Sequence, residues 1–254
     1  MFHPKGPSFF ELAKQGLSST ERGYDLLAPK FDYTPFRTPD SVLSVVAQQL
    51  QRSEPIGSLL DVCCGTGAAM QSLRPLGCHR MVGIDMSAGM LEVARSATQS
   101  APDHAHFEFV RGNALDMPFR EKFDLAVCFG AFGHVLPRDD LRLTRQIAGA
   151  LKPGGRFVFV TSEMSPKWSK VYWFNRVFNA VMHLRNWLLK PPFIMYYFRF
   201  LLTEVQTLLE DAGFTVEVHQ PFERPLERLR LVIATRESQG PAMNWPMPVG
   251  EILI

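Results

Sequence analysis

Two acidic residues stand near the ends of two neighbouring apolar runs, and a glycine-rich turn follows the first of them. Residues 58–67 carry Asp61 in a buried-strand pattern, and then Gly65 and Gly67 in the turn. A strand that ends in such a turn and opens a helix lets backbone amides lie against a ligand, because glycine has no Cβ to block the approach. The next run ends at Asp85, where a carboxylate can accept hydrogen bonds from a ribose. Together the two runs predict a site for a nucleoside cofactor.

The elements that must position these residues alternate along the chain. The pattern predicts strands over 58–63, 80–85, 105–110, 123–129 and 155–161, with helices over about 67–75, 87–99 and 138–151. Two further runs, 214–219 and 229–235, alternate apolar and polar residues, as paired strands at the end of a sheet do. We therefore expect an α/β fold of the Rossmann-like, doubly wound kind. Its seven-stranded sheet would be mostly parallel, with helices on both faces and an antiparallel C-terminal strand.

Composition excludes several classes of protein. The chain has 254 residues, 46% hydrophobic and 20% charged, which is ordinary for a globular protein. Its four cysteines lack metal-ligand spacing, so we expect reduced thiols and no metal site. No signal peptide and no run long enough to span a membrane is apparent, which favours a cytoplasmic protein. Low net charge and the lack of a known binding module argue against nucleic acid as a partner.

The chain reads as one domain with an insertion. We expect an N-terminal helical lid at 1–52, a cofactor-binding core at 53–162, a helical cap inserted after the fifth strand at 163–200, the end of the core at 201–236, and a tail at 237–254. Nothing in the sequence indicates the oligomeric state.

The inserted segment differs chemically from the rest of the chain. Eleven aromatic residues fall within 163–200, and 164–203 contains six basic residues and no acid, whereas the remainder has 21 basic and 25 acidic residues. Three interpretations stay open: a cap whose aromatics form an extra core, an apolar pocket for an acceptor, or a peripheral contact with an anionic membrane through 164–200. A helical projection aligns five residues in one stripe: Trp173, Val177, Ala180, Leu184 and Trp187.

Five stretches occur in the order typical of a known family. They are Leu60–Gly67, Gly83–Ser87 with Met90 and Leu91, Gly112–Phe119, Phe123–Val127 and Leu151–Gly155. In this order they resemble the class I S-adenosylmethionine-dependent methyltransferases, over about residues 40–235. The nearest likeness is to the small-molecule enzymes of quinone and natural-product biosynthesis. The resemblance specifies the fold and the cofactor, not the acceptor.

The resemblance implies a role for each residue of the cofactor site. Asp61, Cys63, Gly65 and Gly67 would shape the pocket for the methionine part, Asp85 would bind the ribose, Met86 would pack on the adenine, Asn113 and Ala114 would contact its edge, and Phe129 or Gly130 would face the amino group or the methyl. Tyr24 belongs to a Tyr-Asp segment that related enzymes often place near the cofactor. The chain departs from the pattern at two positions: Cys63, where glycine is usual, and Asn113, where aspartate is common.

Structural interpretations compete with several of these roles. Asp61 could equally brace the loop, Asp85 could cap a helix, and Asn113 could be an ordinary turn residue. We favour the ribose role for Asp85, because Ser87 is placed to cap the helix. A nicotinamide dehydrogenase fits less well, since its third glycine or alanine would fall at Met70.

Two side chains are candidate general bases. His134 follows the fourth strand and Glu163 the fifth, at the sheet edge where ligands bind in open α/β folds. Both residue types also serve structurally, and methyl transfer can proceed by positioning alone. We therefore expect methyl transfer to a small, apolar or amphipathic acceptor. The alternative is a non-catalytic S-adenosylmethionine-binding module that holds a partner or a membrane.

Overall fold

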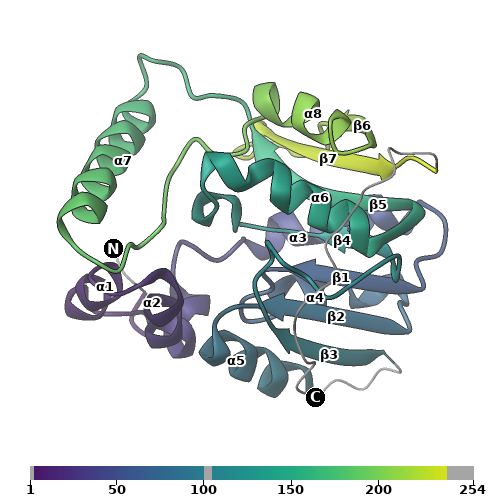
Figure 1. Cartoon of the computed structure of the whole chain (residues 1–254), viewed down its shortest axis with the longest axis horizontal. Coiled ribbons are helices and arrows are strands. Elements are labelled where there is room, and N and C mark those ends of the chain that lie inside the picture. The colour runs from purple at the N-terminus through teal and green to yellow at the C-terminus, as the bar shows by residue number, and fades with distance from the viewer. Residues whose placement is uncertain (1–2, 100–104, 239–254) are drawn as a thin grey trace.

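The computed structural model describes residues 3–99 and 105–238. Its centre is one seven-stranded sheet in the order β3-β2-β1-β4-β5-β7-β6 (Figure 1). The strands are β1 Ser58–Val62, β2 Arg80–Asp85, β3 His106–Arg111, β4 Phe123–Val127, β5 Leu151–Ser162, β6 Phe214–His219 and β7 Leu229–Arg236. β1 to β5 pair in parallel, β7 is antiparallel to β5, and β6 is antiparallel to β7. The predicted Rossmann-like fold is confirmed.

The helices cover both faces of this sheet. They are α1 Phe9–Gly16, α2 Thr20–Leu27, α3 Asp40–Gln51, α4 Ala68–Ser72, α5 Ala88–Gln99, α6 Asp140–Ala150, α7 Lys170–Leu188 and α8 Leu202–Glu210. On one face α6 and α8 pack against the sheet through Leu143, Ile147 and Leu209. On the other, α3 packs through Val46 and Leu50. Alternating strands and amphipathic helices thus bury two apolar layers, which fixes the positions of the loops at the strand ends.

Strand order reverses between β1 and β4, which lie side by side although two strands separate them in the chain. At such a point the connections leave the sheet in opposite directions and open a crevice at the carboxyl ends of the strands. The turn 63–67 after β1 therefore lies at this crevice.

Two predicted elements differ in extent. The predicted helix 67–75 is α4 followed by a 3-10 turn at Arg74–Leu76, because Pro75 cannot continue the helical hydrogen bonds. The fifth strand begins at Leu151 rather than at 155. Leu151 pairs with Phe123, and the register then shifts before Arg156 pairs with Leu125, so the segment at Gly154, whose φ is +76°, is an irregularity within the strand.

The inserted segment contains α7, which stands away from the sheet near α1 and α2 (Figure 1). The chain then returns through an extended stretch to α8. No helix within residues 3–99 and 105–238 is both long and apolar enough to cross a membrane. The predicted tail lies outside the described residues, apart from positions 237 and 238.

Candidate functional site

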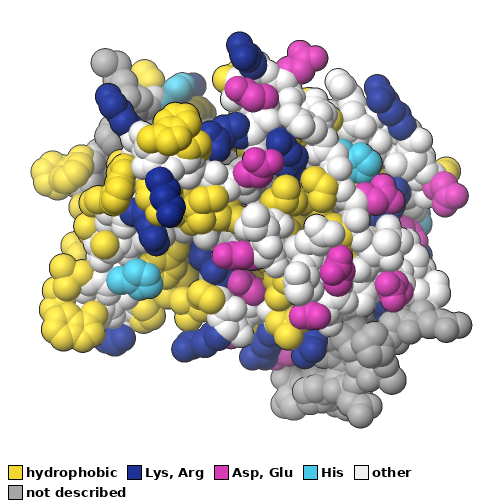
Figure 2. All heavy atoms as spheres, turned by 90° about the horizontal axis from the view of Figure 1, so that it is seen from above, with side chains coloured by type: hydrophobic (Ala, Val, Ile, Leu, Met, Phe, Trp, Pro, Cys, Tyr) yellow, Lys and Arg dark blue, Asp and Glu magenta, His cyan; other side chains and the backbone are white. Residues whose placement is uncertain are grey.

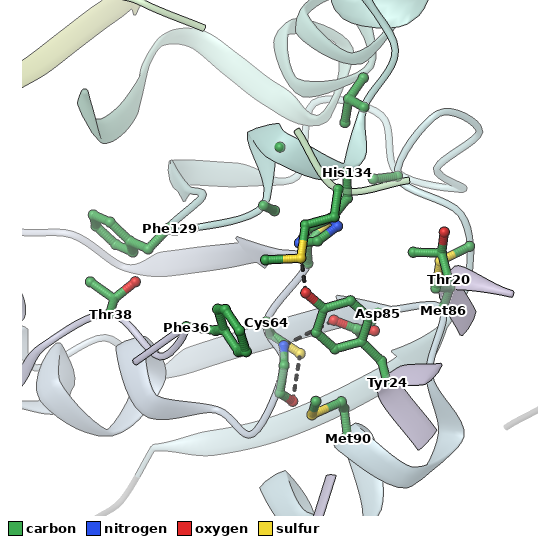
Figure 3. A pocket seen from close by; sticks show the side chains of 18 of the residues that line it. Thr20, Tyr24, Phe36, Thr38, Cys64, Asp85, Met86, Met90, Phe129 and His134 are labelled. Carbon is green, nitrogen blue, oxygen red and sulfur yellow. Dashed lines mark hydrogen bonds between the residues drawn. The ribbon is translucent and has the colours of Figure 1, made fainter. Parts of the chain in front are cut away.

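A cavity of about 570 Å³ opens at the carboxyl ends of the parallel strands (Figure 3). Its floor comes from the residues that follow β1, β2, β3 and β4. Its other walls come from α2, the segment 31–38 and the segment 194–199 at the end of the insertion. Ten of the eleven predicted cofactor residues line it: Tyr24, Asp61, Cys63, Gly65, Asp85, Met86, Asn113, Ala114, Phe129 and Gly130.

Asp61 projects into this cavity from β1. Its side chain is 2% exposed, and its Oδ2 has no hydrogen-bond partner among the described residues. Burial, reinforced by the nearby charge of Asp85, raises the pKa of Asp61 well above its ordinary value. A buried carboxylate oxygen without a partner is unfavourable unless a ligand supplies a donor or a positive charge.

Asp85 braces the loops around the cavity from the end of β2. Its Oδ2 accepts a hydrogen bond from the Gly65 amide at 2.9 Å, and its Oδ1 accepts one from the Ser87 amide at 2.9 Å. Burial raises the pKa of Asp85, although these backbone donors oppose the shift. The Ser87 hydroxyl accepts a hydrogen bond from the Met90 amide at 3.1 Å and so caps α5, as predicted. Asp85 therefore organises the turn and can still meet a ligand, since it lines the cavity.

The turn after β1 consists largely of left-handed backbone. Cys63, Gly65 and Gly67 have φ of +57°, +53° and +78°. This conformation disfavours residues with a Cβ, which accounts for the glycine usual at the position of Cys63. A Cβ on Gly65 would meet nothing within 4 Å, so open space of the cavity lies there. Gly67 does not line the cavity. A Cβ added at Gly67 would lie only 3.2 Å from the Cβ of Ala94 on α5, so the glycine permits a close approach between the turn and this helix.

The residues expected around an adenine lie beyond β2 and β3. Met86 is 40% exposed at the cavity wall, and Ala114 lines the wall beside it. The Oδ1 of Asn113 accepts a hydrogen bond from the Leu115 amide at 2.9 Å, which is an Asx turn. Asn113 thus acts as a turn residue, which was the structural alternative to a ligand contact. Its Nδ2 remains the group that can donate to a ligand.

His134 and Tyr24 form a hydrogen-bonded pair across the cavity (Figure 3). His134 Nδ1 lies 2.6 Å from the Ile194 carbonyl, which can only accept, so Nδ1 carries the proton. Burial lowers the pKa of His134 and keeps the ring neutral, so Nε2 accepts the Tyr24 hydroxyl at 2.6 Å. Burial raises the pKa of Tyr24, so this hydroxyl stays protonated. Both ring nitrogens of the candidate base are therefore engaged.

Glu163, the other candidate base, lies elsewhere. Its Oε1 is 2.9 Å from Arg230 on the neighbouring strand β7, its side chain is half-exposed, and it does not line the cavity. β5 extends to Ser162, and the antiparallel pairing of β7 brings Arg230 opposite Thr161. The structure therefore does not bring Glu163 together with the other site residues.

Two groups of site residues were not singled out in the sequence. Asp25 of α2 accepts hydrogen bonds from the Ser87 hydroxyl at 2.6 Å and the Gly89 amide at 2.9 Å, and Asp32 accepts one from the Thr66 hydroxyl at 2.7 Å. These hydrogen bonds connect the N-terminal segment to the turns that follow β1 and β2. The second group comprises lining residues Phe31, Phe36, Thr38 and Tyr196 to Arg199. In the sequence, only the Tyr-Asp segment at 24–25 pointed to the acids of the first group. The aromatic content of the insertion pointed to the lining residues at 196–198 in the second group.

Comparisons with known proteins agree with this site. Residues 59–155 match a family model described as a methyltransferase domain. A demethylmenaquinone methyltransferase of Lactococcus lactis is 36% identical over 107 residues, which are 41% of each chain. One of Listeria welshimeri is 34% identical over 140 residues, which are 53% of this chain and 57% of that protein. The chain thus matches about half the length of these curated relatives.

A solved structure extends the likeness over nearly the whole fold. The DhpI complex with S-adenosylhomocysteine superposes with a TM-score of 0.63 at 18% identity, covering 91% of this chain and all of that one. Residues 59–155 thus match a methyltransferase domain, and the seven-stranded sheet that contains them has the same fold as this solved S-adenosylhomocysteine complex.

Proposed function

We propose that this chain transfers a methyl group from S-adenosylmethionine to a small, apolar or amphipathic acceptor. The observation that carries the proposal is the cavity itself. It is lined by the buried carboxylate of Asp61, whose Oδ2 has no partner among the described residues, by the open turn at Gly65, and by aromatic rings of the N-terminal segment and the insertion.

The residues of the cavity fit the cofactor. Asp61 would hold the positively charged amino-acid end, Asp85 would accept hydrogen bonds from the ribose hydroxyls, and the space at Gly65 would let the backbone approach. When bound, S-adenosylmethionine supplies a methyl group on a positively charged sulfur, from which a nucleophile can displace it.

The chain's own contribution is positioning and exclusion of water. Phe36, Phe129 and Tyr197 come from three different parts of the chain and line the cavity together. Such a wall orients an apolar acceptor in line with the displaced bond and keeps competing water out. Much of the rate enhancement can come from this arrangement, without a dedicated base.

A nucleophile that must lose a proton can use the Tyr24–His134 pair. His134 Nε2 already accepts the Tyr24 hydroxyl, so we propose that Tyr24 accepts the acceptor's proton at its oxygen while it gives its own proton to His134 Nε2. The neutral ring of His134 and its Nδ1 bond to Ile194 support this direction. Neither residue needs to carry a charge beforehand.

The relatives favour a quinone-like acceptor. The two curated proteins are named for demethylmenaquinone, and the aromatic wall of this cavity suits a flat apolar ring. The alternative, a binding module without catalysis, would need side chains of the cap to fill the space beyond the cofactor turn. The segment 194–199 lines the cavity rather than filling it, which favours the enzyme.

The experiment is a transfer assay with a matched binding measurement. The protein is incubated with S-adenosylmethionine carrying a labelled methyl group and a reduced demethylated naphthoquinone, and the product is identified by mass spectrometry. We expect label in the quinone, and Asp85→Ala should weaken binding of S-adenosylhomocysteine at least tenfold by calorimetry. A 2′,3′-dideoxy analogue should bind wild type and variant alike.

Tight binding without transfer to any apolar acceptor would favour the binding module. Unchanged affinity in Asp85→Ala would remove the ribose assignment. Equal weakening for the ligand and its dideoxy analogue would show instead that Asp85 acts only by bracing Gly65 and Ser87.

A further inference from the structure

Helix α7 is attached to the protein through a side that mixes apolar and polar residues: Tyr172 and Met182 are buried there, and two asparagines bond to the backbone of the following segment. The side chain of Asn179 exchanges two hydrogen bonds with the backbone of Tyr197, at 2.9 and 2.8 Å. Asn186 does the same with the backbone of Phe193, at 2.9 Å each, and also donates to the Tyr196 hydroxyl. Two asparagines two turns apart thus fix the rotation of the helix about its axis.

An arginine on the same side completes the attachment. Arg185 donates to the carbonyls of Gly16 and Ser18, both at 2.9 Å, and to that of Pro191 at 2.7 Å. These bonds tie α7 to the end of α1 as well as to the irregular segment that follows α7. Polar side chains of α7 therefore satisfy backbone groups that would otherwise be left without partners.

The opposite side of the helix faces solvent and is largely apolar. The predicted stripe that includes Trp173, Val177, Leu184 and Trp187 is exposed, with Trp187 76% accessible. Eight exposed residues form this side, which we call the α7 outer face: Trp173, Phe174, Val177, Ala180, Val181, Leu184, Trp187 and Leu188. An amphipathic helix of a globular protein ordinarily buries such a stripe, and a contiguous exposed patch of this kind marks an interaction site.

The charges around the α7 outer face have one sign. Lys167, Lys170, Arg176 and Lys190 are exposed, and the sequence 164–203 contains no acid. Figure 2 shows hydrophobic side chains gathered on the α7 side of the molecule, with basic but no acidic side chains among them. A second copy meeting this face through a two-fold axis would bring like charges together. An anionic surface is the complementary partner.

The shape of the face matches a lipid surface. α7 has 19 residues, so it is roughly 28 Å long, and it does not meet the combined length and apolarity needed to cross a membrane. Tryptophans beside lysines and arginines are the composition of helices that lie in the plane of the headgroups. We propose that the α7 outer face, with Trp168, docks on an anionic lipid bilayer.

This docking would place the cavity at the membrane. α7 bonds to Phe193 and Tyr197 on one side of the segment 194–199. The other side of this segment lines the cavity. An apolar acceptor dissolved in the bilayer would then reach the cavity without crossing water. That last step rests on the proposed function, whereas the binding of lipid does not.

The test uses flotation of the full chain with vesicles of phosphatidylcholine, with and without phosphatidylglycerol. We expect binding to the anionic vesicles, weakened by salt, and quenching of tryptophan fluorescence by brominated phosphatidylcholine mixed into them, since three of the four tryptophans are at 168, 173 and 187. Trp173→Glu and Leu184→Glu should each reduce the bound fraction at least tenfold. Val218→Glu, at an exposed apolar position of β6, is the matched control and should bind as wild type does.

Two results would overturn the proposal. One is the absence of flotation with anionic vesicles, or equal flotation of Trp173→Glu and wild type. The other is a dimer in sedimentation velocity that Trp173→Glu dissociates, which would assign the face to a second copy. Calorimetry with S-adenosylhomocysteine on the same variants separates this outcome from the proposed function, because vesicle binding can fail while cofactor binding persists.

Discussion

At the scale of single residues, the unpartnered oxygen of Asp61 has two consequences of opposite sign. Without a ligand, the buried carboxylate costs stability, and with a cationic ligand it provides affinity. We expect Asp61→Asn to raise the stability of the free protein by about 1 kcal/mol at neutral pH and to weaken binding of S-adenosylhomocysteine at least tenfold. Thermal denaturation and calorimetry measure the two effects.

The sign of the pH dependence follows from the raised pKa of Asp61. A folded-state pKa above the unfolded value means that the folded protein binds the extra proton, so its stability falls as pH rises through the folded pKa. The stabilisation by Asp61→Asn should therefore grow with pH. Asp211→Asn, at an exposed position after α8, is the control. A destabilised Asp61→Asn would mean that the carboxylate braces the loop.

The Tyr24–His134 pair predicts a second set of outcomes. If the pair carries the acceptor's proton, Tyr24→Phe should lower kcat at least tenfold and leave the affinity for S-adenosylhomocysteine within about twofold. The rate should be constant at pH 6.5 and above and should fall only at a lower pH, because His134 must be neutral and burial lowers its pKa below the ordinary 6.5. Tyr33→Phe, outside the cavity, is the matched control.

A merely structural pair would respond differently. Removing the Tyr24 hydroxyl would leave His134 Nε2 buried without a donor, so Tyr24→Phe would lower the melting temperature while kcat and its pH profile stayed unchanged.

At the scale of elements, the lid depends on one carboxylate of α2. Asp25 accepts hydrogen bonds from Ser87 and Gly89 at the start of α5, so it joins α2 to the helix that follows Asp85. We expect Asp25→Ala to reduce the opening free energy of α2 by about 1–2 kcal/mol and to weaken cofactor binding severalfold. Hydrogen exchange measures the first effect. Glu92→Ala, exposed on the same helix α5, should change neither, and equal protection of α2 in Asp25→Ala would show that packing alone holds the lid.

The turn after β1 shows how far local sequence can specify an element. Its glycines and the acid on β2 predicted a loop against a ligand, and Asp85 does receive the Gly65 amide there. The pattern could not distinguish Gly65, which faces the cavity, from Gly67, which packs on Ala94. That distinction depends on where α5 crosses the turn, and α5 lies more than 20 residues further along the chain.

At the scale of the whole molecule, the cofactor cavity and the α7 outer face are separate surfaces. None of the exposed side chains of that face lines the cavity. A saturating ligand should therefore stabilise wild type and Trp173→Glu equally, by about 2.7 kcal/mol at a hundredfold excess over Kd, or roughly 5–10 °C in Tm. Thermal denaturation with S-adenosylhomocysteine measures this, and a much smaller gain in the variant would show that the two surfaces are coupled.

The sequence by itself determined the sheet and most of the cofactor site. Apolar runs, helices between them and glycine turns at strand ends are local signals, and the ends of adjacent parallel strands must meet at one edge of the sheet. Asp61, Asp85, Asn113 and Phe129 follow or end four such strands, so their convergence on one cavity was predictable.

Only the tertiary structure decided which way α7 faces and which side chains pair. Helical periodicity located the stripe of Trp173 and Trp187 but could not tell inward from outward, because that depends on where Asn179 and Asn186 find backbone partners. Likewise, Tyr24 and His134 lie 110 residues apart in the sequence, and Glu163 pairs with Arg230 on β7, which is distant from it along the chain. Contacts between distant segments arise from packing of the whole chain, and no local pattern encodes them.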